Sequence, residues 1–77
     1  MTTYKTEIDL SDKVIADFRK LDAMEWDAEG LDGIKVVDCF QNGRDTAAEE
    51  GFEPGTIEFD NAALYFAVST ARLYEVI

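Results

Sequence analysis

Two blocks of acidic residues that contain no lysine or arginine constrain this chain most, because their carboxylates must stay at the surface of any fold. The first block, residues 22–32, carries five carboxylates, and the second block, residues 45–60, carries six. These 27 residues hold a charge of −11, whereas the other fifty hold six acids against seven bases, or +1. We therefore expect two negative patches on an otherwise balanced domain. Such patches steer a partner of opposite charge.

The length of the chain, 77 residues, allows one domain with one core, which we assign to residues 1–77. A domain of this size buries about 60% of the surface that its unfolded chain exposes, so modest stability is expected. Hydrophobic residues make up 47% of the chain and aromatic residues 12%. Disorder requires low hydrophobicity together with high net charge, and only the second is present, so we expect a folded protein.

Several features constrain where the protein works. Cys39 is the single cysteine, so no disulfide can form within the chain, and its apolar neighbours favour a buried, unreactive thiol. The first residues lack the apolar segment of a signal peptide, and the apolar run at residues 62–68 is far shorter than the roughly 20 residues of a membrane span. We therefore expect a soluble, cytoplasmic protein. Its net charge of −10 would repel nucleic acid and anionic membranes, so we expect no direct binding to either.

The N-terminal part of the chain predicts a strand followed by a helix. Polarity alternates over residues 4–10, which is typical of a strand with one apolar face. Ser11 is then a suitable N-cap, because its hydroxyl can accept a hydrogen bond from a backbone amide of the first helical turn. Apolar residues follow at helical spacing, and Gly30 ends the pattern as a C-terminal glycine would. The helix is expected to reach Gly30 either unbroken or with a second cap at Asp22.

The middle of the chain predicts two further strands. Residues 33–40 are rich in β-branched side chains, which favour a strand. The dipeptide Asn42-Gly43 is typical of a turn. Residues 46–49 could form one turn of helix before glycine and proline residues end it. A short strand is then expected at residues 56–59.

The C-terminal segment, residues 60–77, fits two structures. A helix capped by Asp60 or Asn61 would turn Ala67 and Leu73, among others, toward the core, and the four alanines of the segment favour it. A β-meander would need a second hairpin turn at residues 69–71, where no residue readily adopts a positive φ. We therefore favour the helix and predict an α+β fold in the order β-α-β-β-α, with the helices packed on one face of a short sheet. One helix on a β-meander is the alternative.

The residue types needed for most enzymatic chemistry are missing. The chain has no histidine, which excludes Ser-His-Asp and Cys-His arrangements and removes the commonest metal ligand. No glycine spacing matches a phosphate-binding loop. A calcium loop beginning at Asp38 would place Phe40 at a ligand position, and Phe40 cannot coordinate a metal. We therefore expect no enzymatic activity, no cofactor and no metal site.

The acidic blocks are the candidate partner-binding surface. In the first block four carboxylates are three or four residues apart, so a helix would align them in one stripe, roughly 5–6 Å apart. That spacing is comparable to the separation of phosphates along a nucleic-acid strand. Each block also holds an aromatic residue, and aromatic side chains ringed by charge are typical of interface hot spots. The candidate contact residues are Asp22, Glu25, Trp26, Asp27, Glu29, Asp32, Glu49, Glu50, Phe52 and Glu53.

A simpler interpretation of the same residues is solubility. Runs of charge usually form a solvated face, and Asp and Glu promote solubility or reflect adaptation to a salty host. Trp26 and Phe52 are residue types found more often in a core than on a surface. The two interpretations differ in whether the acidic blocks lie on one face, since contiguous blocks would form one extended negative surface.

Two functional hypotheses follow from this surface. The first is an inhibitor that mimics nucleic acid and occupies the basic groove of a nucleic-acid-binding protein. Small size, strong acidity and chemical inertness are similar in type to phage and mobile-element proteins that block host defence, such as many anti-CRISPR and anti-restriction proteins, although no motif assigns the chain to a family. The second is a structural or regulatory interaction module, such as a homodimer or small subunit. It would bind through an apolar patch formed by Tyr65, Tyr74, Val76 and Ile77.

Overall fold

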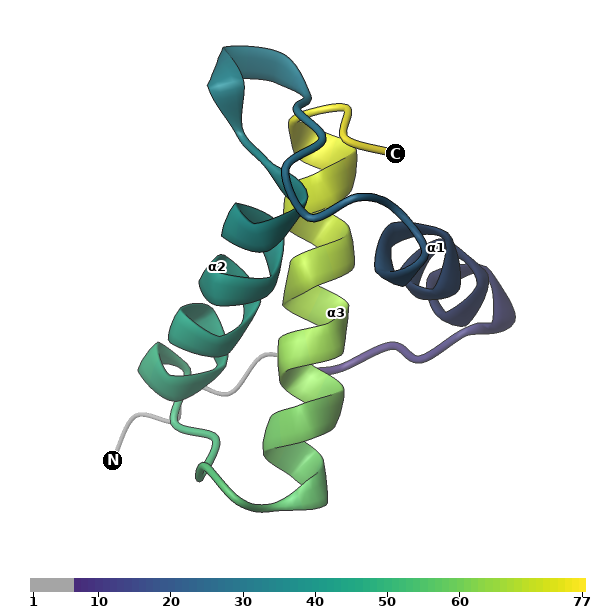
Figure 1. Cartoon of the computed structure of the whole chain (residues 1–77). Helices are drawn as coiled ribbons and strands as arrows, with labels where there is room; N and C mark the ends of the chain where they lie inside the picture. Colours follow the sequence, from purple (N-terminus) through teal and green to yellow (C-terminus); the bar gives the residue numbers. More distant parts are fainter. Residues whose placement is uncertain (1–6) are drawn as a thin grey trace.

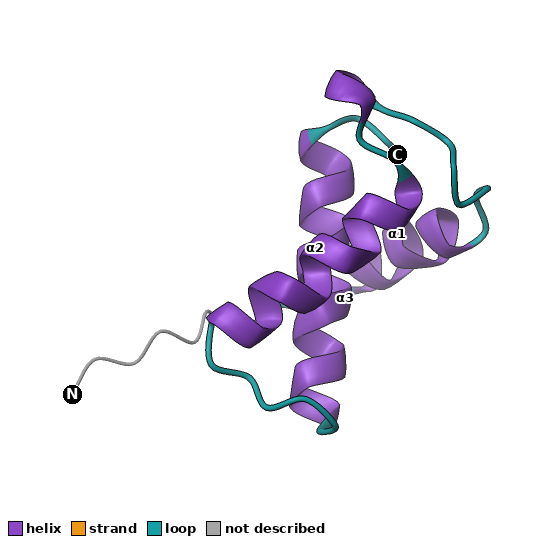
Figure 2. Cartoon of the chain, turned by 60° about the vertical axis from the view of Figure 1, so that its left-hand side comes forward, coloured by secondary structure: helices purple, strands orange, loops and turns teal. Residues whose placement is uncertain are grey.

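The computed structural model describes residues 7–77, and this part of the chain is helical. Helix α1 spans Asp12–Asp22, α2 spans Val36–Glu49 and α3 spans Ile57–Leu73, and the short 3-10 helix η1 spans Leu31–Gly33. Helix α3 is central, with α2 packed along one side and α1 against another (Figure 1). No strand occurs among the described residues (Figure 2). The predicted α+β fold is therefore wrong, and the protein is a small three-helix domain.

Each α-helix begins where a side-chain oxygen accepts a backbone hydrogen bond. At α1 the backbone N–H of Val14 donates to Ser11 Oγ over 3.3 Å, as the sequence predicted. At α3 the N–H of Phe59 donates to Thr56 Oγ1 over 3.1 Å. At α2 the Asp38 carboxylate accepts from the N–H of Lys35 over 2.9 Å. These bonds satisfy amides that the helices leave without a partner.

Two of the predicted strands are helices in the structure. Residues 33–40 contain the start of α2, because Val36, Cys39, Gly43 and Ala47 recur at helical spacing and all four are buried. Residues 56–59 contain the cap and first turn of α3. In both segments burial along one helical face outweighs a local strand preference, which spans only about 1 kcal/mol per residue. The predicted strand at 4–10 lies partly outside the described residues, and residues 7–10 have no regular secondary structure.

The Asn42-Gly43 turn is also wrong, because Gly43 lies in the middle of α2. A Cβ atom built on Gly43 would meet the carbonyl oxygen of Ala63 and would lie 2.9 Å from the backbone nitrogen of Ala67. Helices α2 and α3 therefore approach so closely at this point that only glycine fits. Residues 46–49, predicted as a single turn of helix, form the last turn of α2.

The first helix ends at Asp22 and does not reach Gly30. Beyond Asp22 the chain folds back over the N-terminus of α2, where the carbonyls of Trp26 and Ala28 accept the N–H groups of Val37 and Val36, each over 3.0 Å. Met24 and Ala28 still pack against the core, but they do so from a loop. The apolar residues after residue 22 are thus spaced so that they can pack on the core. The segment is not a helix, because its carbonyls at Trp26 and Ala28 accept hydrogen bonds from the backbone of α2.

The C-terminal helix is confirmed, and the meander alternative is wrong. The helix begins after Thr56, earlier than the expected caps at Asp60 or Asn61. Ala67 is buried as expected, whereas Leu73 is 71% exposed at the end of the helix. The main core cluster gathers around the junction of all three helices and consists of Leu21, Val36, Cys39, Ala67, Ala71 and Val76.

Candidate partner-binding surface

The first acidic block begins at the last residue of α1, Asp22, and continues through the segment that connects α1 to α2. Its five carboxylates are all exposed, but they do not form the predicted helical stripe, because α1 ends at Asp22 and Asp32 adopts a positive φ of 58° within η1. The loop is bound to the N-terminus of α2 through the carbonyls of Trp26 and Ala28. The partial positive charge of a helix N-terminus favours nearby carboxylates, which compensates for part of their mutual repulsion.

The second block covers the other end of α2 and the start of α3. Glu49 is the last residue of α2, and Glu53 lies in the turn that follows; both are exposed, whereas Glu50 is half-buried. A helix C-terminus carries partial negative charge, and the last turn of α2 contains no basic residue. Glu49 therefore lies where a carboxylate is unfavourable for the stability of the helix.

The two aromatic residues of the blocks have different positions. Phe52 is 9% exposed and packs with Ala47 and Ala62 in a second core cluster, so it supports the fold and is not available as an anchor. Trp26 is 66% exposed in the loop that covers the N-terminus of α2. Of the two candidate aromatic contacts, the structure leaves Trp26 accessible to a partner.

The acidic blocks lie at opposite ends of α2, at the top and bottom of Figure 1, and residues of α2 connect them. Asp38, Asp45 and Glu49 are separated by seven and four residues, so their side chains follow one stripe of the helix. Residues 22–60 hold twelve acids and two bases, which equals the whole net charge of −10, whereas the remaining residues hold five of each. The excess of negative charge thus lies between the end of α1 and the first turn of α3, a segment that contains α2 and its two flanking loops.

Asp38 and Asp45 were missed as site residues because α2 was predicted to be a strand and a turn. Their spacing of two helical turns becomes visible only when residues 36–49 are read as one helix. Both residues line a shallow groove between α2 and the end of α3, with a volume of about 520 Å³. We call it the α2–α3 groove. It is lined by Ile34, Asp38, Gln41, Asn42, Asp45, Thr70, Leu73 and Tyr74.

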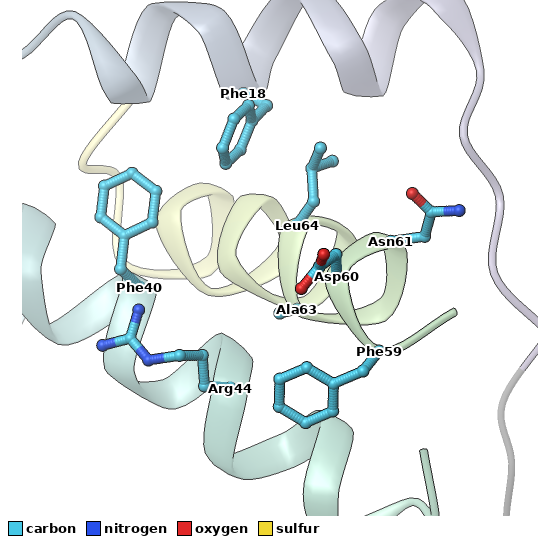
Figure 3. Close-up of a pocket in the computed structure, with 8 residues that line it drawn as sticks. All are labelled: Phe18, Phe40, Arg44, Phe59, Asp60, Asn61, Ala63 and Leu64. Atoms are coloured by element: carbon cyan, nitrogen blue, oxygen red, sulfur yellow. The ribbon is translucent and has the colours of Figure 1, made fainter. Parts of the chain in front are cut away.

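A second groove, of about 350 Å³, is bounded by all three helices (Figure 3). Helix α3 forms its floor, and Phe18 of α1 meets Phe40 of α2 edge to face across it, with ring centroids 5.8 Å apart. Its two charged lining residues, Arg44 and Asp60, have opposite signs. This groove is therefore electrostatically balanced, unlike the acidic stripe of α2.

The α1 side of the molecule contains a well-defined ion pair. Arg72 donates from Nε and Nη2 to Asp17 Oδ2, over 2.9 and 2.6 Å, and Lys13 Nζ lies 3.7 Å from the same oxygen. The hydrogen bonds from Arg72 hold the pKa of Asp17 below its ordinary value of 3.8. This pair ties α1 to α3, and its acid is neutralised locally, in contrast to the acids of residues 22–60.

We expect the Asp17–Arg72 pair to stabilise the fold above about pH 4 and to lose its effect at lower pH. The folded pKa lies below the unfolded one, so the contribution is complete above the unfolded value and is lost as pH falls through the folded value. Arg72→Met should raise the pKa of Asp17, followed by NMR titration, and move acid unfolding to higher pH. Lys13→Met, whose side chain is 78% exposed, is the control and should change little. An unchanged Asp17 titration in Arg72→Met would contradict the assignment.

Further chemistry has little support in the described part of the chain. Cys39 is fully buried, as predicted, and burial raises the pKa of its thiol, which disfavours the reactive thiolate. Residues 7–77 contain no group of three potential ligands placed to hold a metal ion. None of the helices described has the length and apolar character needed to cross a membrane.

We found no match to a protein family, to a characterised protein or to a solved structure.

Proposed function

We propose that the protein is a non-enzymatic inhibitor that presents its acidic side to the basic, nucleic-acid-binding surface of another protein. The observation that carries this proposal is the concentration of the entire net charge of −10 in residues 22–60, which run from the last residue of α1 through α2 to the first turn of α3. A field of one sign on one part of a small protein accelerates encounter with a partner of the opposite sign. Competition with nucleic acid would follow from occupation of the same basic groove. The inhibitor would act in the cytoplasm.

The length of α2, and not the spacing of its three carboxylates, is what compares with a phosphate backbone. From Asp38 to Glu49 the helix rises about 16 Å, and one strand of a nucleic-acid duplex presents about five phosphates over that length. The acidic loops extend the charged surface beyond both ends of α2, in a molecule 39 Å long. A basic groove that accepts a duplex backbone could therefore accommodate this side of the protein along its length.

The position of Glu49 also supports a functional charge. A carboxylate at a helix C-terminus costs about 0.3–1 kcal/mol, and a lysine there would be favourable. A small domain that keeps an acid at the C-terminus of α2 gives up stability that a basic residue at the same position would restore. Such a loss is expected where binding needs the charge.

The test is capture of partners from a host cell lysate on the immobilised protein, followed by elution with salt or with competing duplex DNA. We expect a nucleic-acid-binding protein that is released by both, because exposed charge pairs are screened by salt. The purified partner should bind the double variant Asp45→Asn with Glu49→Gln about fivefold to tenfold more weakly than the wild type.

The matched control is Asp12→Asn with Glu7→Gln, which changes the net charge equally but lies outside residues 22–60. Both control positions are exposed. The control should lower affinity less than twofold. Equal losses in both double variants would show that overall charge, and not the α2 stripe, attracts the partner. A partner that resists both salt and DNA would overturn the proposal.

A further inference from the structure

The α2–α3 groove combines exposed apolar side chains with carboxylates. On the α3 side, Leu73 is 71% exposed and adjoins Tyr74, and Ile34 lines the same groove from the loop before α2. Leu31, which is 49% exposed, is held beside this end of α3 because its N–H donates to the carbonyl of Tyr74. Apolar side chains that gather in one groove with polar groups around them indicate a protein-binding site.

The α2 side of the groove supplies its charge. Asp38 and Asp45 lie two helical turns apart, about 10 Å along the helix. Asp38 accepts a hydrogen bond from the backbone of Lys35 and Asp45 accepts one from Gln41, but neither forms an ion pair within residues 7–77. Both carboxylates therefore remain available to cations of a partner.

A hydrogen bond between side chains of α2 and α3 fixes the shape of the groove. Asn42 Nδ2 donates to Thr70 Oγ1 over 2.7 Å, and Thr70 Oγ1 in turn donates to the carbonyl of Phe66 over 2.9 Å. This chain of hydrogen bonds fixes α2 against α3 between the acidic and apolar sides. The separation of the carboxylates from Leu73 is thus set by the fold before a partner arrives, which reduces the ordering needed on binding.

We propose that the α2–α3 groove is the anchor of the inhibitor on its target. The target contributes an amphipathic segment whose large apolar side chain covers Leu73, Ile34 and Tyr74, while lysine or arginine residues flank it and pair with Asp38 and Asp45. This inference rests on the proposed function and adds an apolar anchor to its electrostatic contact. The acidic stripe attracts the target, and the apolar contact determines how long the complex lasts.

Charge complementarity selects a basic segment over a second copy of this chain. Self-association through the groove would bring two acidic sides together, and each molecule carries a net charge of −10. Like charges facing each other across an interface oppose association. A basic amphipathic segment satisfies both sides of the groove at once.

The test uses two fluorescent helical peptides of 14 residues that carry the same lysines, two of them seven residues apart. One peptide has leucines along its opposite face, and in the other each leucine is replaced by glutamine, which preserves helix propensity and charge. Fluorescence anisotropy gives the dissociation constant of each peptide for the folded protein. We expect the leucine peptide to bind about tenfold more tightly than the glutamine peptide.

Three variants locate the contact. Leu73→Ser should remove the advantage of the leucine peptide, whereas Ile57→Ser, equally exposed at the other end of α3, should leave it unchanged. Asp45→Asn should weaken both peptides to the same degree. Circular dichroism verifies that each variant is folded, which is expected because these side chains are exposed.

The outcomes separate this inference from the proposed function. If Leu73→Ser has no effect while Asp45→Asn weakens both peptides, the apolar anchor is overturned and the electrostatic function stands. If the leucine peptide binds independently of Asp45 and of salt, the proposed function and the basic segment inferred here are both overturned. Failure of both peptides to bind in low salt also overturns both.

Discussion

Gly43→Ala should destabilise the protein by about 2 kcal/mol, because the new methyl group cannot fit between α2 and α3. Its Cβ would meet the carbonyl oxygen of Ala63 and would lie 2.9 Å from the nitrogen of Ala67, and these are backbone atoms that can move only with their helix. A protein of 77 residues has a free energy of unfolding of about 4–12 kcal/mol, so the loss is a large part of the total. Urea unfolding followed by circular dichroism at 222 nm measures it.

The sign of this effect separates packing from helix propensity. At an exposed helical position, glycine to alanine would stabilise by about 1 kcal/mol. Ala48→Gly, on the exposed face of α2, is the control and should cost about 1 kcal/mol. Adding Ala67→Gly should not rescue Gly43→Ala, because it removes only the contact with a Cβ atom 3.0 Å away. A Gly43→Ala protein as stable as the wild type would show that the helices are farther apart than described.

Leu21→Ala should destabilise the protein by about 3 kcal/mol, since deletion of a buried leucine side chain costs 2–5 kcal/mol. Leu21 is fully buried and carries α1 into the main core cluster with Val36 and Ala71. The loss should lower the midpoint of thermal unfolding by about 12 °C or more. Differential scanning calorimetry measures the shift.

Ile57→Ala is the matched control for Leu21→Ala, because it removes a similar side chain that is 71% exposed. It should change stability by less than about 0.5 kcal/mol. If hydrogen exchange shows that Leu21→Ala frees the amides of α1 while α2 and α3 stay protected, α1 is a separately melting unit. Equal effects of the two substitutions would contradict the burial of Leu21.

The sequence correctly predicted those structural features that depend only on residues close together in the chain. Ser11 starts α1 because its hydroxyl reaches Val14 within the same turn, and the four alanines after residue 60 favour the helix that is observed. The burial of Cys39 also followed from its apolar neighbours. The start of α3 was misplaced because Thr56 was assigned to a strand, although its hydroxyl makes the same kind of cap as Ser11.

The candidate site was only partly predictable for the same reason. Composition predicted that the two acidic blocks would be exposed, and their carboxylates are exposed apart from the half-buried Glu50. The groove was not predictable, because Leu73 comes beside Asp38 and Asp45 only when two helices distant in sequence pack together. Of the apolar patch predicted from the C-terminal residues, Val76 is 7% exposed and belongs to the core, whereas Tyr65, Tyr74 and Ile77 are half-buried.

The sequence by itself determined the charge of this protein and those helical features that depend on neighbouring residues, namely the Ser11 cap of α1 and the alanines of α3. Tertiary structure decided the rest, and α2 is the clearest example. Its β-branched start and its Asn42-Gly43 dipeptide favour other local structures by amounts near 1 kcal/mol, but Gly43 allows close contact with Ala63 and Ala67. Burial of a whole helical face against α3 outweighs these preferences. That packing also places the acids of α2 between the two acidic blocks, which lie at opposite ends of the helix.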